Sequence, residues 1–194
     1  MTRRAPANRV RRAGTSSRSA VTVEVLVCGA PDRGDDGAAI AAMAFLGNRV
    51  PDDVQVRVIG ELDIDDLLAI PTEAGVVIVD AAIGLRAGRV MELALGGLIG
   101  REDGPRPRSS HALAFPEVVG LADFMRGRPL RGRVVVIGGS AFGLGASLSA
   151  PVAAALPTLA TAVLDAVEDV RAEVRTTDTT VSQASLASAT SDVV

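Results

Sequence analysis

Apolar and polar residues follow one another in blocks along the chain, and these blocks predict strands and helices in alternation. Short runs that are wholly apolar or alternate with polar residues indicate strands, whereas longer segments with apolar residues three or four positions apart indicate helices. The predicted strands cover residues 23–28, 54–59, 76–79, 90–93 and 133–137, and the predicted helices cover residues 37–47, 61–70, 115–125 and 151–170. Fully apolar strands separated by helices are typical of a parallel sheet that is covered on both faces. We therefore predict an α/β fold, a three-layer αβα sandwich with a mainly parallel central sheet of about five strands.

The two ends of the chain differ in composition from its middle. Residues 1–20 contain six arginines and no acidic residue, although the whole chain has a net charge of −3. Such a segment is typical of a nucleic-acid contact or a transit peptide, but two simpler interpretations are favoured: a disordered tail, or a start codon upstream of a true start near Val21. Residues 172–194 are rich in Ser, Thr and Ala without apolar periodicity, and they too are predicted to be disordered. Residues 21–171 then form a single α/β domain, long enough to bury one core.

Composition excludes several classes of protein. The single cysteine, Cys28, excludes an internal disulfide framework and a cysteine-rich zinc site. The chain has no lysine, which excludes a lysine nucleophile and a P-loop. It has no Trp or Tyr and only 4 Phe, so it lacks the aromatic surfaces that bind single-stranded nucleic acid. The most apolar segment, residues 151–170, is interrupted by polar residues and Pro157, so we expect no membrane span and a cytoplasmic protein.

The candidate chemistry lies where the first strand meets the first helix, in the nine-residue sequence GAPDRGDDG of residues 29–37. In parallel α/β folds this junction opens onto the ligand crevice at the carboxyl edge of the sheet. A dinucleotide site would have G-x-G-x-x-G here, whereas acidic side chains repel phosphate. The loop therefore indicates a cation site or proton transfer. One carboxylate, that of Asp35 or Asp36, is enough to cap the helix, which leaves the other for chemistry.

Two further residues extend this candidate site. Asp80 follows the third predicted strand, and a right-handed crossover brings the first and third strands side by side, so Asp36 and Asp80 should share one edge. A carboxylate buried there is costly unless it is paired or bound to a metal. His111, the only histidine, lies in a polar loop before a predicted helix. Two carboxylates and one imidazole suit a divalent metal such as nickel or zinc.

The order of these motifs resembles that of the hydrogenase maturation proteases. Four segments carry the resemblance: residues 29–37 are similar to the family's G-N-x-x-x-x-D-[DE]-G loop, residues 77–81 to its strand ending in D-A, residues 110–113 to its [ST]-H-x-x loop, and residues 148–157 to its closing L-S-x-x-V and A-L-P segment. Ala30 stands in place of the usual Asn of the first loop, and Gly139 and Ser140 stand where the family commonly has Glu.

This resemblance implies an endopeptidase that removes the C-terminal extension of the nickel-loaded large-subunit precursor of a nickel–iron hydrogenase. It implies that nickel arrives with the substrate, and that Asp36, Asp80 and His111 are the catalytic and nickel-contacting residues. We expect a monomer that contacts neither nucleic acid nor membrane.

Two alternatives remain open: a non-catalytic chaperone or binding module of the same fold for a metalloprotein precursor, and a small-molecule or nucleotide-binding α/β domain. The acidic first loop argues against the second.

Overall fold

The computed structural model describes residues 22–98 and 114–191, with side chains as far as Thr176. At its centre is a five-stranded sheet with the spatial order β2-β1-β3-β5-β4. The strands are β1 (Val23–Val27), β2 (Val54–Val58), β3 (Gly75–Ala82), β4 (Val90–Ala94) and β5 (Gly132–Gly138). The first four strands in that spatial order are mutually parallel, and only β4 is antiparallel, to β5. The predicted mainly parallel sheet is confirmed.

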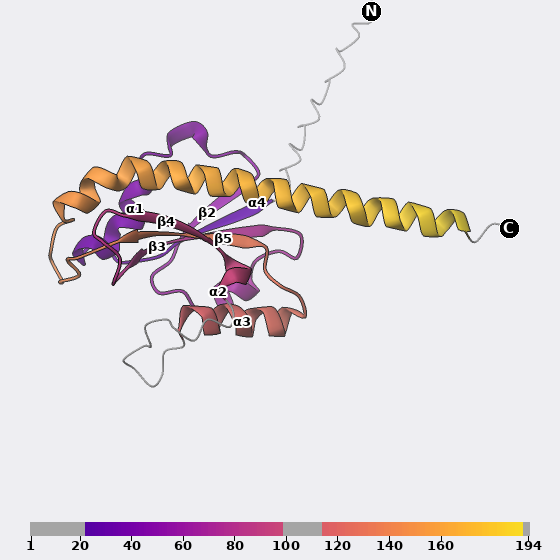
Figure 1. The fold of residues 1–194 in the computed structure, drawn as a ribbon, viewed down its shortest axis with the longest axis horizontal. Helices are drawn as coiled ribbons and strands as arrows, with labels where there is room; N and C mark the ends of the chain where they lie inside the picture. Colours follow the sequence, from indigo (N-terminus) through magenta and orange to yellow (C-terminus); the bar gives the residue numbers. More distant parts are fainter. Residues whose placement is uncertain (1–21, 99–113, 192–194) are drawn as a thin grey trace, which may run out of the picture.

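Helices cover both faces of the sheet. They are α1 (Ala38–Met43), α2 (Ile64–Leu68), α3 (Phe115–Arg126) and α4 (Ala150–Ser191). Three short 3-10 turns complete the described elements: η1 (Gly34–Gly37), η2 (Gly47–Arg49) and η3 (Leu95–Gly97). In Figure 1, α1 and α4 lie on one face of the sheet, and α2 and α3 lie on the other. The three-layer αβα arrangement is therefore as predicted from the sequence.

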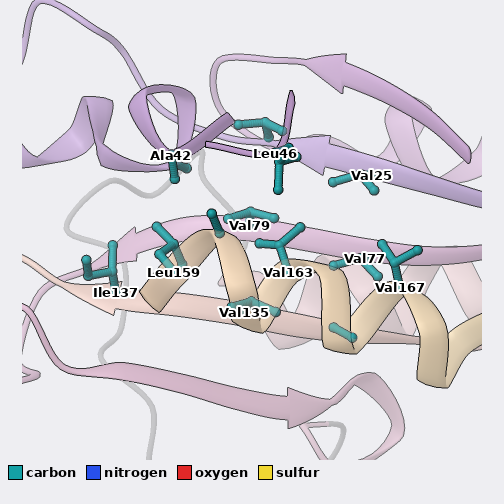
Figure 2. Packing of buried hydrophobic residues seen from close by; sticks show 14 of the residues in the cluster. Val25, Ala42, Leu46, Val77, Val79, Val135, Ile137, Leu159, Val163 and Val167 are labelled. Atoms are coloured by element: carbon teal, nitrogen blue, oxygen red, sulfur yellow. The ribbon is translucent and has the colours of Figure 1, made fainter. Parts of the chain in front are cut away.

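The larger part of the core lies between the sheet and the layer of α1 and α4. Figure 2 shows strand residues such as Val77 and Val135 facing the apolar stripe of α4, which includes Leu159 and Val163. All four of these side chains are buried. A smaller cluster around Ile78 fills the space under α2 and α3. Because the strands are buried on both faces, they appear in the sequence as continuous apolar runs.

Helix α4 is much longer than the sequence predicted, because it continues to Ser191 instead of ending near residue 170. The expectation that the chain is disordered from residue 172 is therefore wrong for the described part of that segment. Val174 is buried against the sheet, and Arg171 pairs with Asp53 at 2.8 Å, so contacts with the domain hold the helix beyond the predicted end. Past Thr176 the helix extends away from the sheet (Figure 1). The predicted N-terminal tail, residues 1–20, lies outside the described residues.

One part of α4, Ala150–Thr176, has the length and composition of a membrane-spanning helix, which the sequence analysis did not expect. Its apolar stripe is nevertheless used inside the protein, since Leu159, Val163 and Val167 are at most 3% exposed. The core helix of a globular α/β domain satisfies the same criteria of length and composition. Packing on the sheet therefore accounts for the apolar character of α4.

Candidate active site

A cleft of about 440 Å³ opens at the carboxyl edge of the parallel strands. Its walls come from the loop after β1, the segment between β2 and α2, the end of β3 and the loop after β5. Among its lining residues are Gly29, Arg33, Asp36, Leu62, Asp80 and Phe142. The structure thus brings Asp36 and Asp80 into one cleft, because β1 and β3 are neighbours with Val27 in register with Val79. His111, the third residue of the sequence-based hypothesis, lies outside the described residues.

Asp36 is held by the same loop that presents it to the cleft. Its Oδ2 accepts a hydrogen bond from the backbone N–H of Ala30 at 2.9 Å, so the backbone of that residue orients the carboxylate. Gly29 lets the loop close on itself, because a Cβ at this position would lie only 2.0 Å from the carbonyl oxygen of Asp36. Gly29 also has a φ of 111°, which residues with a side chain rarely adopt. The position of the carboxylate therefore depends on a glycine seven residues earlier.

We expect Gly29→Ala to lower stability by about 1 to 3 kcal/mol or more and to impair the site, since the new methyl group must displace the backbone of Asp36. Thermal unfolding followed by far-UV circular dichroism measures the loss. Gly84→Ala is the matched control, because Gly84 has a φ of 95° and a Cβ there meets nothing within 4 Å. Equal losses in the two variants would contradict the proposed close contact with Asp36.

The neighbouring acid, Asp35, has a different role from the one predicted. Neither η1 nor α1 has a side-chain cap, so the expectation that Asp35 or Asp36 caps the helix is wrong. Its side chain is fully buried and anchors the loop after β5. Oδ2 accepts hydrogen bonds from the backbone N–H groups of Ser140 (2.7 Å) and Ala141 (2.9 Å). Ser149 adds its backbone N–H to Oδ1 at 2.7 Å and its hydroxyl to Oδ2 at 2.9 Å.

These donors determine the charge state of Asp35. Burial by itself would raise the pKa of the carboxyl, but the N–H groups of Ser140, Ser149 and Ala141 and the Ser149 hydroxyl outweigh it and hold the pKa below its ordinary value. Asp35 is thus a stable anion that fastens the first loop to the loop after β5. It is a structural residue and does not line the cleft.

The pKa of Asp80 is shifted in the opposite direction from that of Asp35. It lies within β3, which continues to Ala82, and not after the end of the strand as the sequence suggested. Burial raises the pKa of the Asp80 carboxyl from 3.8 to about 6; a hydrogen bond from the N–H of Ala81 (2.7 Å) opposes this, and the negative charge of Asp36 adds to it. A carboxyl that titrates near neutral pH is suited to accept a proton or to bind a cation.

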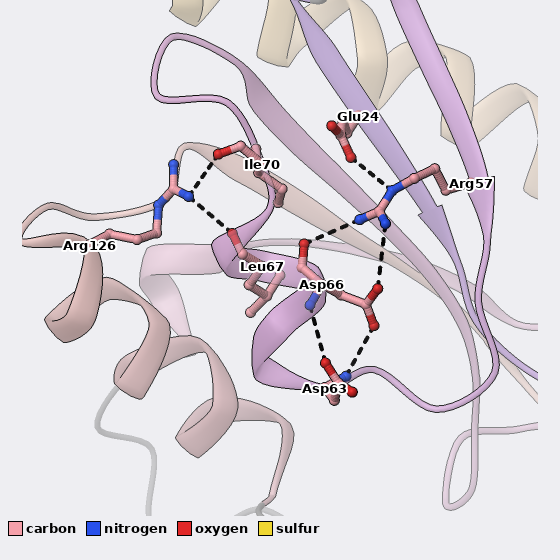
Figure 3. Close-up of polar contacts among 7 residues, drawn as sticks. All are labelled: Glu24, Arg57, Asp63, Asp66, Leu67, Ile70 and Arg126. Atoms are coloured by element: carbon pink, nitrogen blue, oxygen red, sulfur yellow. Dashed lines mark hydrogen bonds and ion pairs between the residues drawn. The ribbon is translucent and has the colours of Figure 1, made fainter.

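Helix α2, which follows the cleft-lining segment after β2, is held by two arginines that the sequence did not indicate (Figure 3). Arg57 of β2 pairs with the buried Glu24 of β1 at 3.0 Å and reaches the carboxylate of Asp66 at 3.6 Å. Arg126 of α3 donates to the carbonyl oxygens of Leu67 (3.0 Å) and Ile70 (2.8 Å) at the end of α2. A charged residue inside the apolar run of β1 was the available signal for such an ion pair.

Three acidic residues line the cleft, Asp36, Glu61 and Asp80, but the described residues contain no group of three metal-binding side chains close enough to hold one ion. Cys28 also lines the cleft, but its side chain is buried. Burial, followed by the charges of Asp80, Asp66 and Asp36, raises the pKa of the Cys28 thiol far above its ordinary value, so the thiol stays protonated and is a poor metal ligand. The cleft thus offers the carboxylates of Asp36 and Asp80, which belong to a class of side chain that can bind a cation or accept a proton.

Comparison with known proteins supports the fold. No family model matches the chain, and a search of curated proteins gives no match. Solved structures do match: the hydrogenase maturating endopeptidase HybD from E. coli has a TM-score of 0.62 at 18% identity, over 76% of this chain and 93% of its own. The [NiFe] hydrogenase maturation protease HycI from Thermococcus kodakarensis has a TM-score of 0.58 at 19% identity, over 76% and 93%.

A hydrogenase 2 maturation peptidase from a Thaumarchaeota archaeon has a TM-score of 0.51 at 25% identity, over 75% of this chain and 97% of its own. The matches extend over nearly the full length of these three proteins. The chain therefore has the fold of the hydrogenase maturation proteases, and the resemblance predicted from its four motifs is confirmed at the level of the fold.

Proposed function

We propose that the protein is an endopeptidase that removes the C-terminal extension of a nickel-loaded hydrogenase large-subunit precursor. The observation that carries this proposal is the placement of Asp36 and Asp80 in one cleft at the carboxyl edge of the sheet. The fold supports it, because structures with this fold are named as maturation endopeptidases. Release of the extension would activate the hydrogenase.

In this proposal nickel is part of the substrate and not a resident cofactor. The carboxylates of Asp36 and Asp80 fill open coordination positions on nickel already bound in the precursor, and His111 supplies the third ligand. The placement of both carboxylates in one cleft supports this proposal, because carboxylates are among the side chains that bind divalent metals. Cleavage then follows one of two routes: the metal polarises the scissile carbonyl, or a carboxylate activates water as a general base.

The proposal extends to the cellular setting. A buried, protonated cysteine and the absence of any second cysteine are compatible with the reducing cytoplasm, where the precursor would be folded and loaded. We propose a cytoplasmic monomer.

The direct test is incubation of the purified protein with nickel-loaded and nickel-free precursor, followed by mass spectrometry of the large subunit. We expect only the loaded form to be shortened, and Asp36→Asn to abolish the reaction, because an amide is a weak cation ligand and a poor base. Asp32→Asn, the same exchange at an exposed position of the same loop, should retain activity.

Two results of this experiment would contradict the proposal. One is cleavage of the nickel-free form at the same rate, which would remove nickel from the recognition step. The other is binding of the loaded precursor without cleavage, which would identify the protein as a non-catalytic binding module of the same fold.

A further inference from the structure

Arg33 is the only positively charged residue that lines the cleft, among the residues that the structure describes. The other charged lining residues are all acidic: Asp36, Glu61 and Asp80. An arginine in such surroundings would be expected to pair with one of these acids. Within the described residues, however, no ion pair or side-chain hydrogen bond involves Arg33, although Asp36 is only three positions away.

The backbone around Arg33 is fixed on both sides, whereas its exposed side chain has no ion pair with any residue that the structure describes. The preceding carbonyl, of Asp32, accepts a hydrogen bond from Gly145 at 2.7 Å, and the following N–H, of Gly34, donates to Ala146 at 3.1 Å. The N–H of Arg33 itself donates to Ala30 at 3.1 Å. The loop after β5 thus holds the Cα of Arg33 at the rim of the cleft and leaves the guanidinium for a group that comes from outside.

The chemistry of the cleft indicates which group that is. A guanidinium is planar and can bind a carboxylate in a bidentate manner, through two parallel N–H···O hydrogen bonds. The cleft also has apolar lining residues, Leu62, Ile83 and Phe142, which would exclude water when a peptide binds and so strengthen an ion pair. The other charged lining residues are acidic and repel an anion, so among the described lining residues Arg33 is the group that can bind a carboxylate.

We propose that Arg33 is a specificity-determining residue that binds a carboxylate of the C-terminal extension of the substrate. This inference rests on the function proposed above and adds a requirement to it: the extension must present an anion to the first loop. The anion is either an acidic side chain of the extension or the terminal carboxylate of the precursor. In both cases Arg33 contributes to binding of the extension, while Asp36 and Asp80 remain free for the metal.

The test compares wild type, Arg33→Gln and Arg33→Lys for binding and cleavage of the nickel-loaded precursor. Loss of a charge-assisted contact should raise KM about tenfold to a hundredfold, with kcat changed less than about threefold, and lysine should recover part of the loss. Arg89→Gln is the matched control, because Arg89 is exposed and does not line the cleft. An unchanged KM in Arg33→Gln, or an equal increase in Arg89→Gln, would overturn the inference.

Modified precursors identify the carboxylate. In one, the acidic side chains of the extension are replaced by amides; in a second, made by peptide ligation, the C-terminus is amidated; a third carries both changes. The effect of Arg33→Gln should disappear on the precursor that lacks the relevant carboxylate, and an undiminished effect on the third would overturn the inference. If wild type binds the precursor without cleaving it, the proposed protease activity fails, while the same comparison of binding constants still decides the role of Arg33.

Discussion

Asp80→Asn should make the folded protein more stable at neutral pH while abolishing cleavage of the nickel-loaded precursor. In the wild type, burial raises the pKa of this carboxyl to about 6, so at neutral pH the folded state contains a carboxylate that its surroundings disfavour. Asparagine has no charge to bury, and its oxygen can still accept the hydrogen bond from the N–H of Ala81. The expected gain is on the order of 1 to 3 kcal/mol, as the shift in pKa implies.

The pH dependence of this gain follows from the direction of the shift. A group whose pKa is higher in the folded than in the unfolded state favours folding fully below the unfolded value, and this contribution is lost as pH rises through the folded value. For Asp80 the loss falls between about pH 4 and pH 6. The stability difference between Asp80→Asn and wild type should therefore be small near pH 4, increase up to about pH 6 and then remain constant.

Chemical denaturation of both proteins across this pH range measures the effect, with Asp32→Asn as the control. Asp32 is exposed, so its exchange should change stability by less than about 0.5 kcal/mol at any pH. A variant that is less stable than wild type at neutral pH would show that the Asp80 carboxylate is a structural group. Full cleavage activity in a stabilised variant would exclude Asp80 from the chemistry.

A stabilising mutation that removes activity separates function from architecture more clearly than a destabilising one. Most substitutions in a folded domain lower stability, so loss of activity alone does not distinguish damage to the fold from damage to the site. Asp36 and Asp80 lie close enough for the charge of one to raise the pKa of the other, which costs free energy in the folded protein. Such an arrangement is typical of functional sites, where local stability is sacrificed for chemistry.

The features that sequence predicted well are those that depend on local pattern and chain handedness. Buried strands give continuous apolar runs, so β1, β3 and β5 were located within two or three residues. The right-handed crossover then placed β1 beside β3, which is enough to bring Asp36 and Asp80 to one edge. This part of the site required no knowledge of side-chain contacts.

The features that sequence missed depend on contacts between distant segments. Ser140, whose backbone N–H donates to Asp35, lies 105 positions further along the chain. Nothing in the sequence around Asp35 distinguishes a carboxylate that anchors a distant loop from one that caps a helix. The extension of α4 was missed because apolar periodicity fades after Val174, and the Ser and Thr residues that follow have only moderate helix propensity. Arg57 and Arg126 are ordinary surface residues by sequence, and only the structure shows what they contact.

The largest loss of stability is expected for Asp35→Asn. The carboxylate accepts four hydrogen bonds shorter than 3 Å, three of them from backbone N–H groups, whereas the amide offers one acceptor oxygen. At least one buried N–H must therefore face the new NH₂ group. The expected cost is roughly 2 to 4 kcal/mol, from lost charge-assisted bonds and an unsatisfied donor.

The pH dependence of this variant should be opposite in sign to that of Asp80→Asn. The pKa of Asp35 is lower in the folded state than in the unfolded chain, so its contribution to stability is present above the unfolded value and is lost as pH falls through the folded value. The difference between wild type and Asp35→Asn should thus be largest near neutral pH and diminish in acid. Denaturation at a series of pH values measures it.

Asp36→Asn is the matched control for Asp35→Asn, because it makes the same exchange at the adjacent residue, whose Oδ2 accepts one backbone hydrogen bond. Asp36→Asn should retain most of the stability of the wild type and lose cleavage. Asp35→Asn should lose stability, and its cleavage activity should fall only to the extent that the loop after β5 detaches. Lowering the temperature, or adding a stabilising osmolyte, should then restore part of the activity of Asp35→Asn and none of that of Asp36→Asn. If Asp35→Asn instead keeps wild-type stability but loses all cleavage, then Asp35, and not its neighbour, is the acid that acts on the substrate.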